Sequence, residues 1–347
     1  MRRIALKLLA AAAVVVPAFT AQANAMPRQQ LEEMASKMAT QLAQVCPRAG
    51  YNDTAAYRSC ADALQNATFL PIVQEGILWG GDQATLKIKK RHLTHFNTKV
   101  FQAMYLPLMT FTGNWSLAHD DRENLDIIEV EAFFRNQLPA GEYPYPFWHN
   151  AGKWNDYEKM STVRFYLNDK GRIFVGTRGK SGNEAARGQY AHVDHEPFQK
   201  DQWQWTDDKG QLQPTITLFS ARYQPANPHL GRLDQTYRAF AAEMRQASCV
   251  GCHSPQNPSD MEQLTLLQTP SHAAGEIDRV IAQVEQKKMP LDDIGMAKEI
   301  DPKLRENILK TAQAFRNEVA AADAWEATRP NRGAVAFTTD ANKPTAR

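Results

Sequence analysis

The amino-acid sequence predicts an α+β protein, in which an N-terminal helical hairpin and further helices precede antiparallel β-hairpins and a mostly α-helical segment follows. Three observations lead to this prediction. Apolar residues recur at helical spacing over the first part of the chain. Two stretches in the middle alternate apolar and polar residues around turn sequences. Helical spacing then returns beyond residue 231 and continues almost to the C-terminus.

The first part of the chain favours helices. Between residues 27 and 45 the apolar or small side chains fall three or four residues apart: Leu31, Met34, Ala35, Met38, Leu42 and Val45. A second helix is expected over residues 54–64, and the two should form a hairpin. The same spacing predicts helices over residues 92–109 and 126–138.

The middle of the chain favours strands. Pro144 and Pro146 exclude a helix where they stand, because proline lacks a backbone N–H and crowds the preceding turn. Beyond them, residues 163–167 and 173–177 alternate around a turn at 168–171, which is typical of a β-hairpin. Residues 203–205 and 215–219 flank a similar turn at 207–210 and predict a second hairpin.

The last part of the chain again favours helices. Residues 223–231 contain two prolines and no periodicity, so we expect a linker there. Helices are expected over about 233–244, 275–288 and 302–322. Pro302 suits the first turn of the last helix, and Asp301 could cap it.

The N-terminus has the layout of a cleavable signal peptide. Arg2 and Arg3 precede a short apolar stretch, and residues 23–25 read Ala-Asn-Ala, a typical cleavage site. The alternative is a retained membrane anchor, but the apolar stretch is short and Pro17 interrupts it. We therefore expect residues 1–25 to be removed and the mature protein to be periplasmic, without a membrane span.

Charge gives no indication of a nucleic-acid or anionic-membrane partner. The formal net charge of the whole chain is +2. It falls to about −1 when Arg2, Arg3 and Lys7 leave with the signal peptide. A chain of 347 residues is long enough for one large core or two domains.

The chain has four cysteines, and two of them lie close together near the N-terminus. In an oxidising compartment Cys46 and Cys60 are most simply a disulfide across a loop of turn-favouring residues. The alternative is a pair of buried thiols. Either interpretation gives the pair a structural role.

The other two cysteines belong to a Cys-x-x-Cys-His motif formed by Cys249, Cys252 and His253. Two thiols at this spacing can add to the two vinyl groups of a haem, and the adjacent histidine can bind the iron axially. Such attachment takes place outside the bacterial cytoplasm, so the signal peptide and the motif support each other. A zinc site is less favoured, because no second Cys/His pair stands at zinc-site spacing.

From about residue 233 to 325 the chain resembles a class I c-type cytochrome, on the strength of this motif and a Met-Pro pair at 289–290. The resemblance implies one covalent haem c in a mostly α-helical domain over residues 231–326. We recognise no family for residues 26–230, which should form a separate α+β domain. Residues 327–347 are expected to be a disordered tail.

The second axial ligand of the iron is expected to be Met289. This residue follows an expected helix and precedes Pro290, where class I cytochromes carry the iron-binding methionine. Met296 and His272 are the alternatives, with Met261 or an open position also possible. Met289 could instead be a core methionine that only fills space.

Other candidate residues have plainer interpretations. His92 with His95, and His192 with His195, could each contribute to a second metal site, but no further ligands accompany them. An aromatic group could line a small-molecule pocket, although a core layer is the more common role: Tyr143, Tyr145, Phe147 and Trp148. The sequence shows no Ser/His/Asp arrangement and no glycine-rich phosphate loop.

Together these observations predict a periplasmic mono-haem c-type cytochrome that transfers electrons with a redox partner protein. The alternative is a haem enzyme or small-ligand sensor with an open or displaceable distal site. A third possibility makes residues 26–230 a docking or ligand-binding module that uses the haem as its electron outlet. Binding one haem requires only part of a chain of this length, and the remaining residues are the argument for these alternatives.

Overall fold

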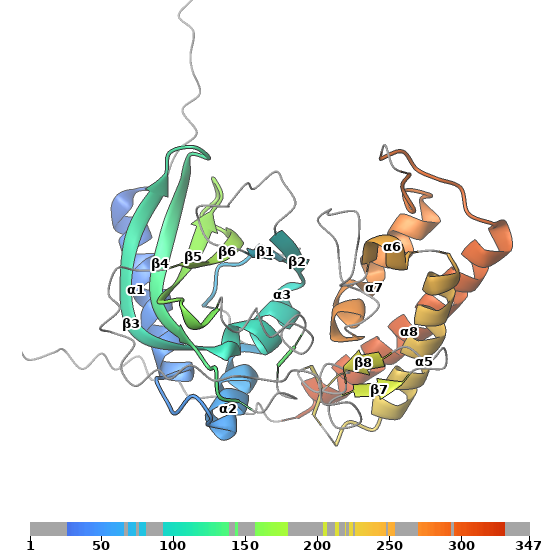
Figure 1. Ribbon diagram of the computed structural model, residues 1–347, viewed down its shortest axis with the longest axis horizontal. Helices are drawn as coiled ribbons and strands as arrows, with labels where there is room; N and C mark the ends of the chain where they lie inside the picture. The colour runs from blue at the N-terminus through green and yellow to red at the C-terminus, as the bar shows by residue number, and fades with distance from the viewer. Residues whose placement is uncertain are drawn as a thin grey trace, which may run out of the picture.

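The computed structural model describes these residues: 26–65, 69–73, 76–80, 93–138, 143–144, 157–179, 204–206, 212–214, 219, 222–224, 226–247, 249–253, 270–292 and 295–329. Helices and a mixed six-stranded sheet confirm the α+β class. Figure 1 shows the sheet with its helices on one side of the molecule and α5 to α8 on the other. We call these the sheet unit (residues 26–179) and the helical unit (residues 219–329).

Each unit has a hydrophobic core of its own. The sheet unit encloses buried side chains from Leu31 to Ile173, and the helical unit encloses a second set from Phe219 to Ala322. Two separate cores explain how the chain builds two bodies, because each body buries apolar surface within itself. The expected signal peptide lies outside the described residues, as does the tail expected over 327–347 except for residues 327–329, of which Ala327 is the last residue of a helix.

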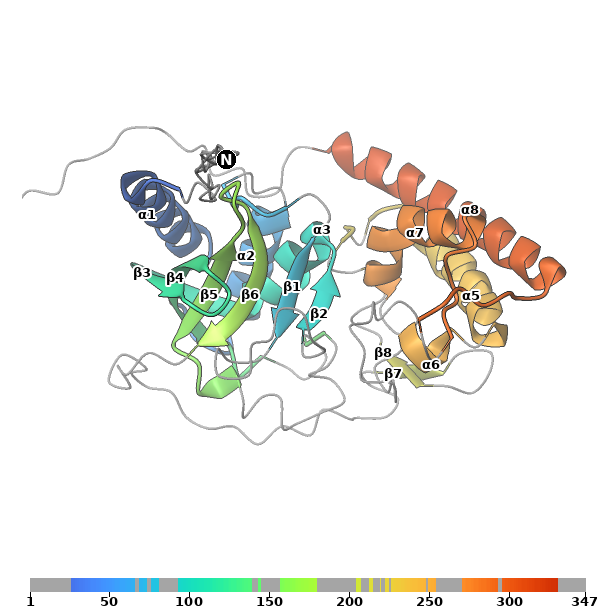
Figure 2. The ribbon, with the colours of Figure 1, turned by 90° about the horizontal axis from the view of Figure 1, so that it is seen from above.

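The main sheet has the strand order β2-β1-β6-β5-β4-β3. Its strands are β1 (Ile77–Gly80), β2 (Leu93–Phe96), β3 (Met109–Asp120), β4 (Leu125–Phe134), β5 (Thr162–Leu167) and β6 (Ile173–Gly179). Only the β1–β6 pair is parallel within this sheet. The other pairs are antiparallel, as Figure 2 lets the reader follow from above.

Helix α1 (Arg28–Val45) packs on the long strand β3. Its buried residues lie three or four apart and so form one face of the helix: Leu31, Ala35, Met38, Ala39, Leu42 and Val45. Strand β3 bends at Gly113, whose φ of +91° lies at a shift in the β3–β4 register. Glycine adopts this backbone conformation without the steric cost of a side chain.

A disulfide joins α1 to α2 (Thr54–Gln65). Cys46 follows the last residue of α1 and Cys60 lies in α2, with their Cα atoms 4.8 Å apart. This result confirms the predicted pairing. The Cys46 carbonyl also accepts a hydrogen bond from Phe111 N of β3 (2.9 Å), so the link between the two helices is fixed to the edge of the sheet.

An antiparallel strand pair lies in each of the two segments that alternate in sequence, but the second pair ends at Pro214, before the strand predicted over residues 215–219. Strands β5 and β6 pair across the turn at 168–171, where the Asn168 side chain accepts hydrogen bonds from Lys170 N and Arg172 N. The short strands β7 (Gln204–Thr206) and β8 (Leu212–Pro214) form a separate two-stranded sheet.

The helix predicted over residues 126–138 is wrong, because residues 125–134 form strand β4. Ile128, Val130 and Ala132 alternate into the sheet-unit core, while Glu129 and Glu131 lie between them. Glu129 pairs with Arg164 of β5, and Glu131 accepts hydrogen bonds from β3. Pairing with strands on both sides outweighs the helical preference of the local sequence.

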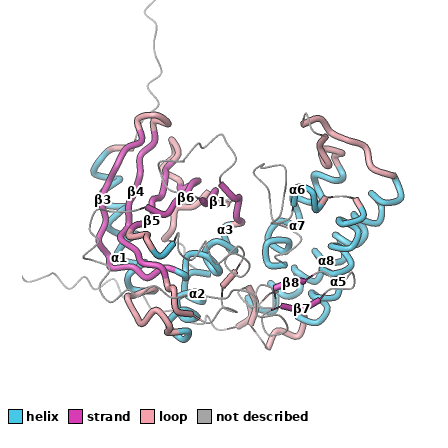
Figure 3. The backbone as a smooth tube through the Cα atoms, in the orientation of Figure 1, coloured by secondary structure: helices cyan, strands magenta, loops and turns pink. Residues whose placement is uncertain are grey.

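The helix predicted over residues 92–109 forms only in its second half. Residues 93–96 are strand β2, and helical turns run from Thr98 to Leu108 as α3 (Thr98–Val100), η2 (Phe101–Tyr105) and η3 (Leu106–Leu108). Asn97 begins this helical stretch, since its side chain accepts a hydrogen bond from Lys99 N at 3.0 Å. The cyan and magenta segments of Figure 3 show this change of structure along the chain.

The helical unit consists of α5 (Leu230–Gln246), α6 (Val250–His253), α7 (Pro270–Glu285) and α8 (Pro302–Ala327). Asp301 caps α8 by accepting a hydrogen bond from Leu304 N at 2.9 Å, as predicted. Helix α7 begins five residues earlier than predicted, because Pro270 occupies a position in its first turn. The expected linker at 223–231 instead packs on α8, where Tyr223 and Asn227 are buried.

The two units meet where α3 approaches α7. Asn97 Nδ2 donates a hydrogen bond to the Gly275 carbonyl oxygen at 3.0 Å. A Cβ atom at position 275 would lie 2.9 Å from Asn97 Cβ, closer than side chains pack. The absence of a side chain at Gly275 therefore permits this contact.

Within the described ranges, none of the helices is both long enough and apolar enough to cross a membrane.

Removing the disulfide should destabilise the sheet unit. Replacing both Cys46 and Cys60 with Ala should lower the free energy of unfolding by about 3 kcal/mol, because the unfolded chain loses its restraint. Urea unfolding of the mature protein measures this difference, and reduction of the unaltered protein should reproduce it. Alkylation of both thiols in denatured, unreduced protein would show instead that the cysteines are not bonded.

Replacing Gly275 with Ala should destabilise the protein although alanine is the better helix former by about 1 kcal/mol. The added Cβ meets Asn97, which is held by its bonds to Gly275 O and Lys99 N. We expect a net loss of about 1–2 kcal/mol in thermal unfolding. Gly231→Ala is the control, since nothing lies within 4 Å of its added Cβ. Equal shifts for both variants would contradict the argument.

Candidate haem-attachment site

The Cys-x-x-Cys-His motif lies just after the end of helix α5, at one end of the helical unit. Leu233, Tyr237 and Phe240 are buried in its core and fix the helix against α8. After α5 ends at Gln246, Cys249 N donates a hydrogen bond to the Met244 carbonyl oxygen at 3.1 Å. This bond joins Cys249 to the last turn of α5, so the motif is anchored directly to the end of that helix.

The motif itself forms a single helical turn. Cys252 N and His253 N both donate to the Cys249 carbonyl oxygen, at 3.2 and 2.8 Å. In a helix, residues three and four positions apart lie on the same face. Cys249, Cys252 and His253 therefore share one face of this turn, the arrangement that attachment of one planar group through all three requires.

The two thiols of the motif are not bonded to each other and are half-buried. Cys249 packs against the core of the helical unit. Burial, with a smaller contribution from the nearby Cys252, raises the pKa of its thiol to about 11. The thiol is therefore protonated at neutral pH in the protein without a bound group. Two thiols and one imidazole at this spacing are the donor set that covalent haem attachment uses.

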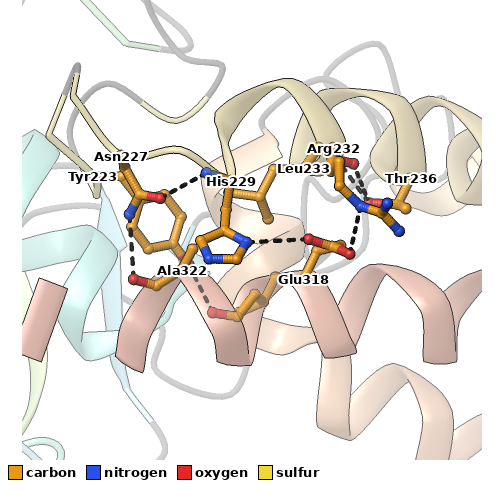
Figure 4. A network of polar contacts seen from close by, with 9 residues as sticks. Tyr223, Asn227, His229, Arg232, Leu233, Thr236, Glu318 and Ala322 are labelled. Atoms are coloured by element: carbon orange, nitrogen blue, oxygen red, sulfur yellow. Dashed lines mark hydrogen bonds and ion pairs between the residues drawn. The ribbon is translucent and has the colours of Figure 1, made fainter. Parts of the chain in front are cut away.

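Helix α8 closes the unit by packing against α5. Polar contacts join the two helices at the start of α5 (Figure 4). Asn227 Nδ2 donates to the Ala322 carbonyl oxygen at 3.2 Å, and Glu318 of α8 accepts from Arg232 Nε at 2.8 Å. Because Asn227 Oδ1 also accepts from His229 N, this side chain fixes the entry into α5.

Met289 follows the end of α7 by four residues and is half-buried. Met296 is 62% exposed and lies in a loop that a bridge between Leu291 and Ala297 closes. Of the two methionines, Met289 is the one with partial burial, which a thioether needs in order to be shielded from water. Met261 lies outside the described residues.

His272 faces the sheet unit. It is 1% exposed, and its ring contacts those of Phe96 (4.9 Å between centroids) and Tyr105 (5.7 Å). Burial, with a smaller contribution from His95, lowers its pKa to about 3, so the ring is neutral at physiological pH. These contacts direct the ring away from the core that α5, α7 and α8 share, which does not favour His272 as the axial ligand.

Of the four histidines considered for a second metal site, the structure describes His95. His95 lies in strand β2 rather than on a helix, and its Nδ1 is 3.6 Å from Glu276 Oε1. In the described part of the chain there is no group of three or more His, Cys, Asp or Glu side chains that could hold a metal ion. His92, His192 and His195 lie outside it.

Tyr143 belongs to the core of the sheet unit. Its hydroxyl donates to the Arg135 carbonyl oxygen and accepts from Leu138 N at 3.2 Å. It is fully buried and packs against Phe134. This placement favours a structural role for Tyr143, while Tyr145, Phe147 and Trp148 lie outside the described residues.

The face of α7 that contacts the sheet unit was not predicted from the sequence. His272, Gly275 and Glu276 recur at helical spacing and contact the sheet unit. Glu276 is buried and pairs with Arg279 at 2.9 Å as well as with His95. Histidine and glutamate four residues apart in a helix were the available signal, but the predicted helix began at 275 and so excluded His272.

No family model, curated protein or solved structure matches this chain.

Replacing Asn227 with Ala should loosen the junction of α5 and α8. The change removes hydrogen bonds to Ala322 O, Glu326 and His229 N from a buried position, so we expect a loss of about 2 kcal/mol in stability. Chemical denaturation followed by circular dichroism measures it. Asn317→Ala on the exposed side of α8 is the control and should change stability by less than about 0.5 kcal/mol. Equal effects would contradict a special role for Asn227.

Proposed function

We propose that the protein is a periplasmic mono-haem c-type cytochrome that transfers electrons to or from a redox partner protein. The observation that most supports this proposal is the single helical turn directly after α5, in which Cys249, Cys252 and His253 share one face. The class I cytochrome resemblance of residues 231–326 supports it. So does the order of a helix, the motif, a further helix, a methionine and a closing helix.

In this proposal the chain's own residues hold the cofactor in place. Haem, when bound, supplies an iron that alternates between ferrous and ferric states and so carries one electron. Cys249 and Cys252 would hold it covalently and His253 would bind the iron. Because Cys249 packs against the core of the helical unit, this attachment would be rigid and structural change during electron transfer would be small.

Met289 is proposed as the second axial ligand. Histidine and methionine together raise the reduction potential relative to two nitrogen ligands. With both axial positions filled, no place at the iron is left for a substrate. This is why electron transfer, rather than catalysis at the iron, is the function that these residues favour.

A second candidate is a haem enzyme or small-ligand sensor, in which the distal ligand is absent or displaceable. The sheet unit favours it, because a six-stranded sheet with its own core is far more than one haem requires. In that case residues 26–230 would bind a substrate or partner. The identity of the distal ligand distinguishes the two candidates.

Covalent haem is the first test. Expression in a strain competent in cytochrome maturation, followed by denaturing electrophoresis and haem staining, should give a stained band. Cys252→Ala should lose one thioether bond and most of the holoprotein, whereas Cys60→Ala should keep the stain because its disulfide lies in the sheet unit. A colourless band from the unaltered protein would overturn the proposal.

Replacing Met289 with Ala should abolish the charge-transfer absorption of a methionine–iron bond at the red end of the spectrum. It should also lower the reduction potential, because thioether sulfur favours ferrous iron. Met296→Ala is the matched control and should leave the spectrum unchanged, since Met296 is mostly exposed.

Exchange of these two behaviours would make Met296 the ligand and leave the cytochrome proposal intact. If neither variant changes the spectrum, the distal position is open or filled by His272. The enzyme or sensor would then become the better proposal.

A further inference from the structure

A cleft of about 620 Å³ lies between the sheet unit and the helical unit. The lining comes from α2, α7, α8 and residues 97–102, which we call the α3 region. Ile72, Val73 and Arg222 complete it. Its size is within the range of small-molecule sites, and such sites occur preferentially between domains. The proposed function assigns no role to this cleft.

A buried amide lines the cleft. Gln102 is only 4% exposed, and its side chain makes no hydrogen bond to any residue that the structure describes. Its neighbours in η2, Phe101 and Met104, are buried apolar residues. The amide is not one of the buried polar atoms that lack a partner, so it reaches the water in the cleft, and a polar group of a ligand could take the place of that water.

Arg222 presents a second buried polar group. It is 8% exposed and lines the same cleft. Its Nε donates to Tyr223 Oη and its Nη2 to Asp323 Oδ2, both at 2.8 Å. The Arg222 carbonyl oxygen accepts from Gln65 Nε2 at 2.6 Å, which ties the helical unit to α2. The guanidinium is therefore held rigidly at the wall of the cleft.

Among the charged side chains that line the cleft, the cations outnumber the anions by one. Arg222 pairs with Asp323, and Arg316 pairs with Asp278 at 2.6 Å. Lys99 is exposed and, in the part of the chain that the structure describes, its ammonium group has no acidic partner. The cleft therefore carries a net charge of one positive unit, located at the entrance beside the α3 region.

Apolar side chains complete the lining on both units. Ile72 and Val73 lie on the sheet unit, and Ile277 and Val319 lie on the helical unit. A ligand that fits this combination has one negative charge, a polar group for the amide and an apolar body. We propose that the cleft binds a small organic monocarboxylate, with its carboxylate at Lys99 and its second polar group at Gln102.

This inference does not depend on haem, so it can be tested whether or not the proposed function holds. The test measures binding of benzoate and 4-hydroxybenzoate to the full mature protein by isothermal titration calorimetry. Benzamide, which has the same shape without the charge, and inorganic phosphate are compared. We expect benzoate to bind more tightly than benzamide, and the hydroxyl group to strengthen binding further.

Two variants locate the site. Lys99→Gln should weaken benzoate binding about tenfold and leave benzamide unchanged, because only the charged contact is lost. Gln102→Leu should remove the added affinity of 4-hydroxybenzoate over benzoate. Lys310→Gln on the exposed surface of α8 is the matched control for charge and should have no effect.

Lys99 is exposed, so its variant should fold normally even if the buried Gln102→Leu change does not. Absence of carboxylate binding at 10 mM ligand, at roughly the weak limit of specific sites, would overturn the proposal. Binding that Lys99→Gln leaves unchanged would do so as well. Lys99-dependent binding of phosphate in preference to benzoate would replace the carboxylate with an inorganic anion and overturn the assigned ligand class.

Discussion

Helix α7 has two buried faces, and most of the arrangement depends on this constraint. One face contributes Ala273, Ile277 and Ile281 to the core that α5 and α8 share. The other turns His272 and Glu276 toward strand β2 and the helical turns that follow it. A helix buried on two sides cannot move without disturbing both units. It therefore fixes the helical unit against the sheet unit, forms a wall of the cleft and sets the starting point of the chain that leads to Met289.

The polar residues at this contact carry an energetic cost that their partners reduce. Glu276 is a buried carboxylate, and Arg279 and His95 lie close enough to offset its desolvation. His272 stays neutral between two aromatic rings because burial lowers its pKa, although its Nε2 has no hydrogen-bond partner in the described part of the chain. Because Glu276 lies in α7 and His95 lies in β2, their contact joins the helical unit to the sheet unit.

The parts of this architecture that sequence could predict are those determined by local chemistry. Helices α1 and α8 have a single apolar face and a recognisable start, and Asp301 before Pro302 marked the beginning of α8. Cys46 and Cys60 were close in sequence and had no competing role. Strand β4 and the first half of the 92–109 segment were mispredicted because their structure depends on pairing with other strands, β3 and β5 for β4 and β1 for residues 93–96. The cleft could not be predicted at all, because Gln102, Arg222 and Lys99 meet only when the two units dock.

The close approach at Gly275 has a consequence for how this chain can change over evolutionary time. Position 275 excludes a Cβ while position 97 carries one, since the nearest atom is Asn97 Cβ at 2.9 Å. Only glycine at position 97 would remove that atom, and it would also lose the side chain that accepts from Lys99 N and donates to the α7 carbonyl. The two positions should therefore vary together in related sequences. Covariation between them would be a signature of this particular docking of the two units.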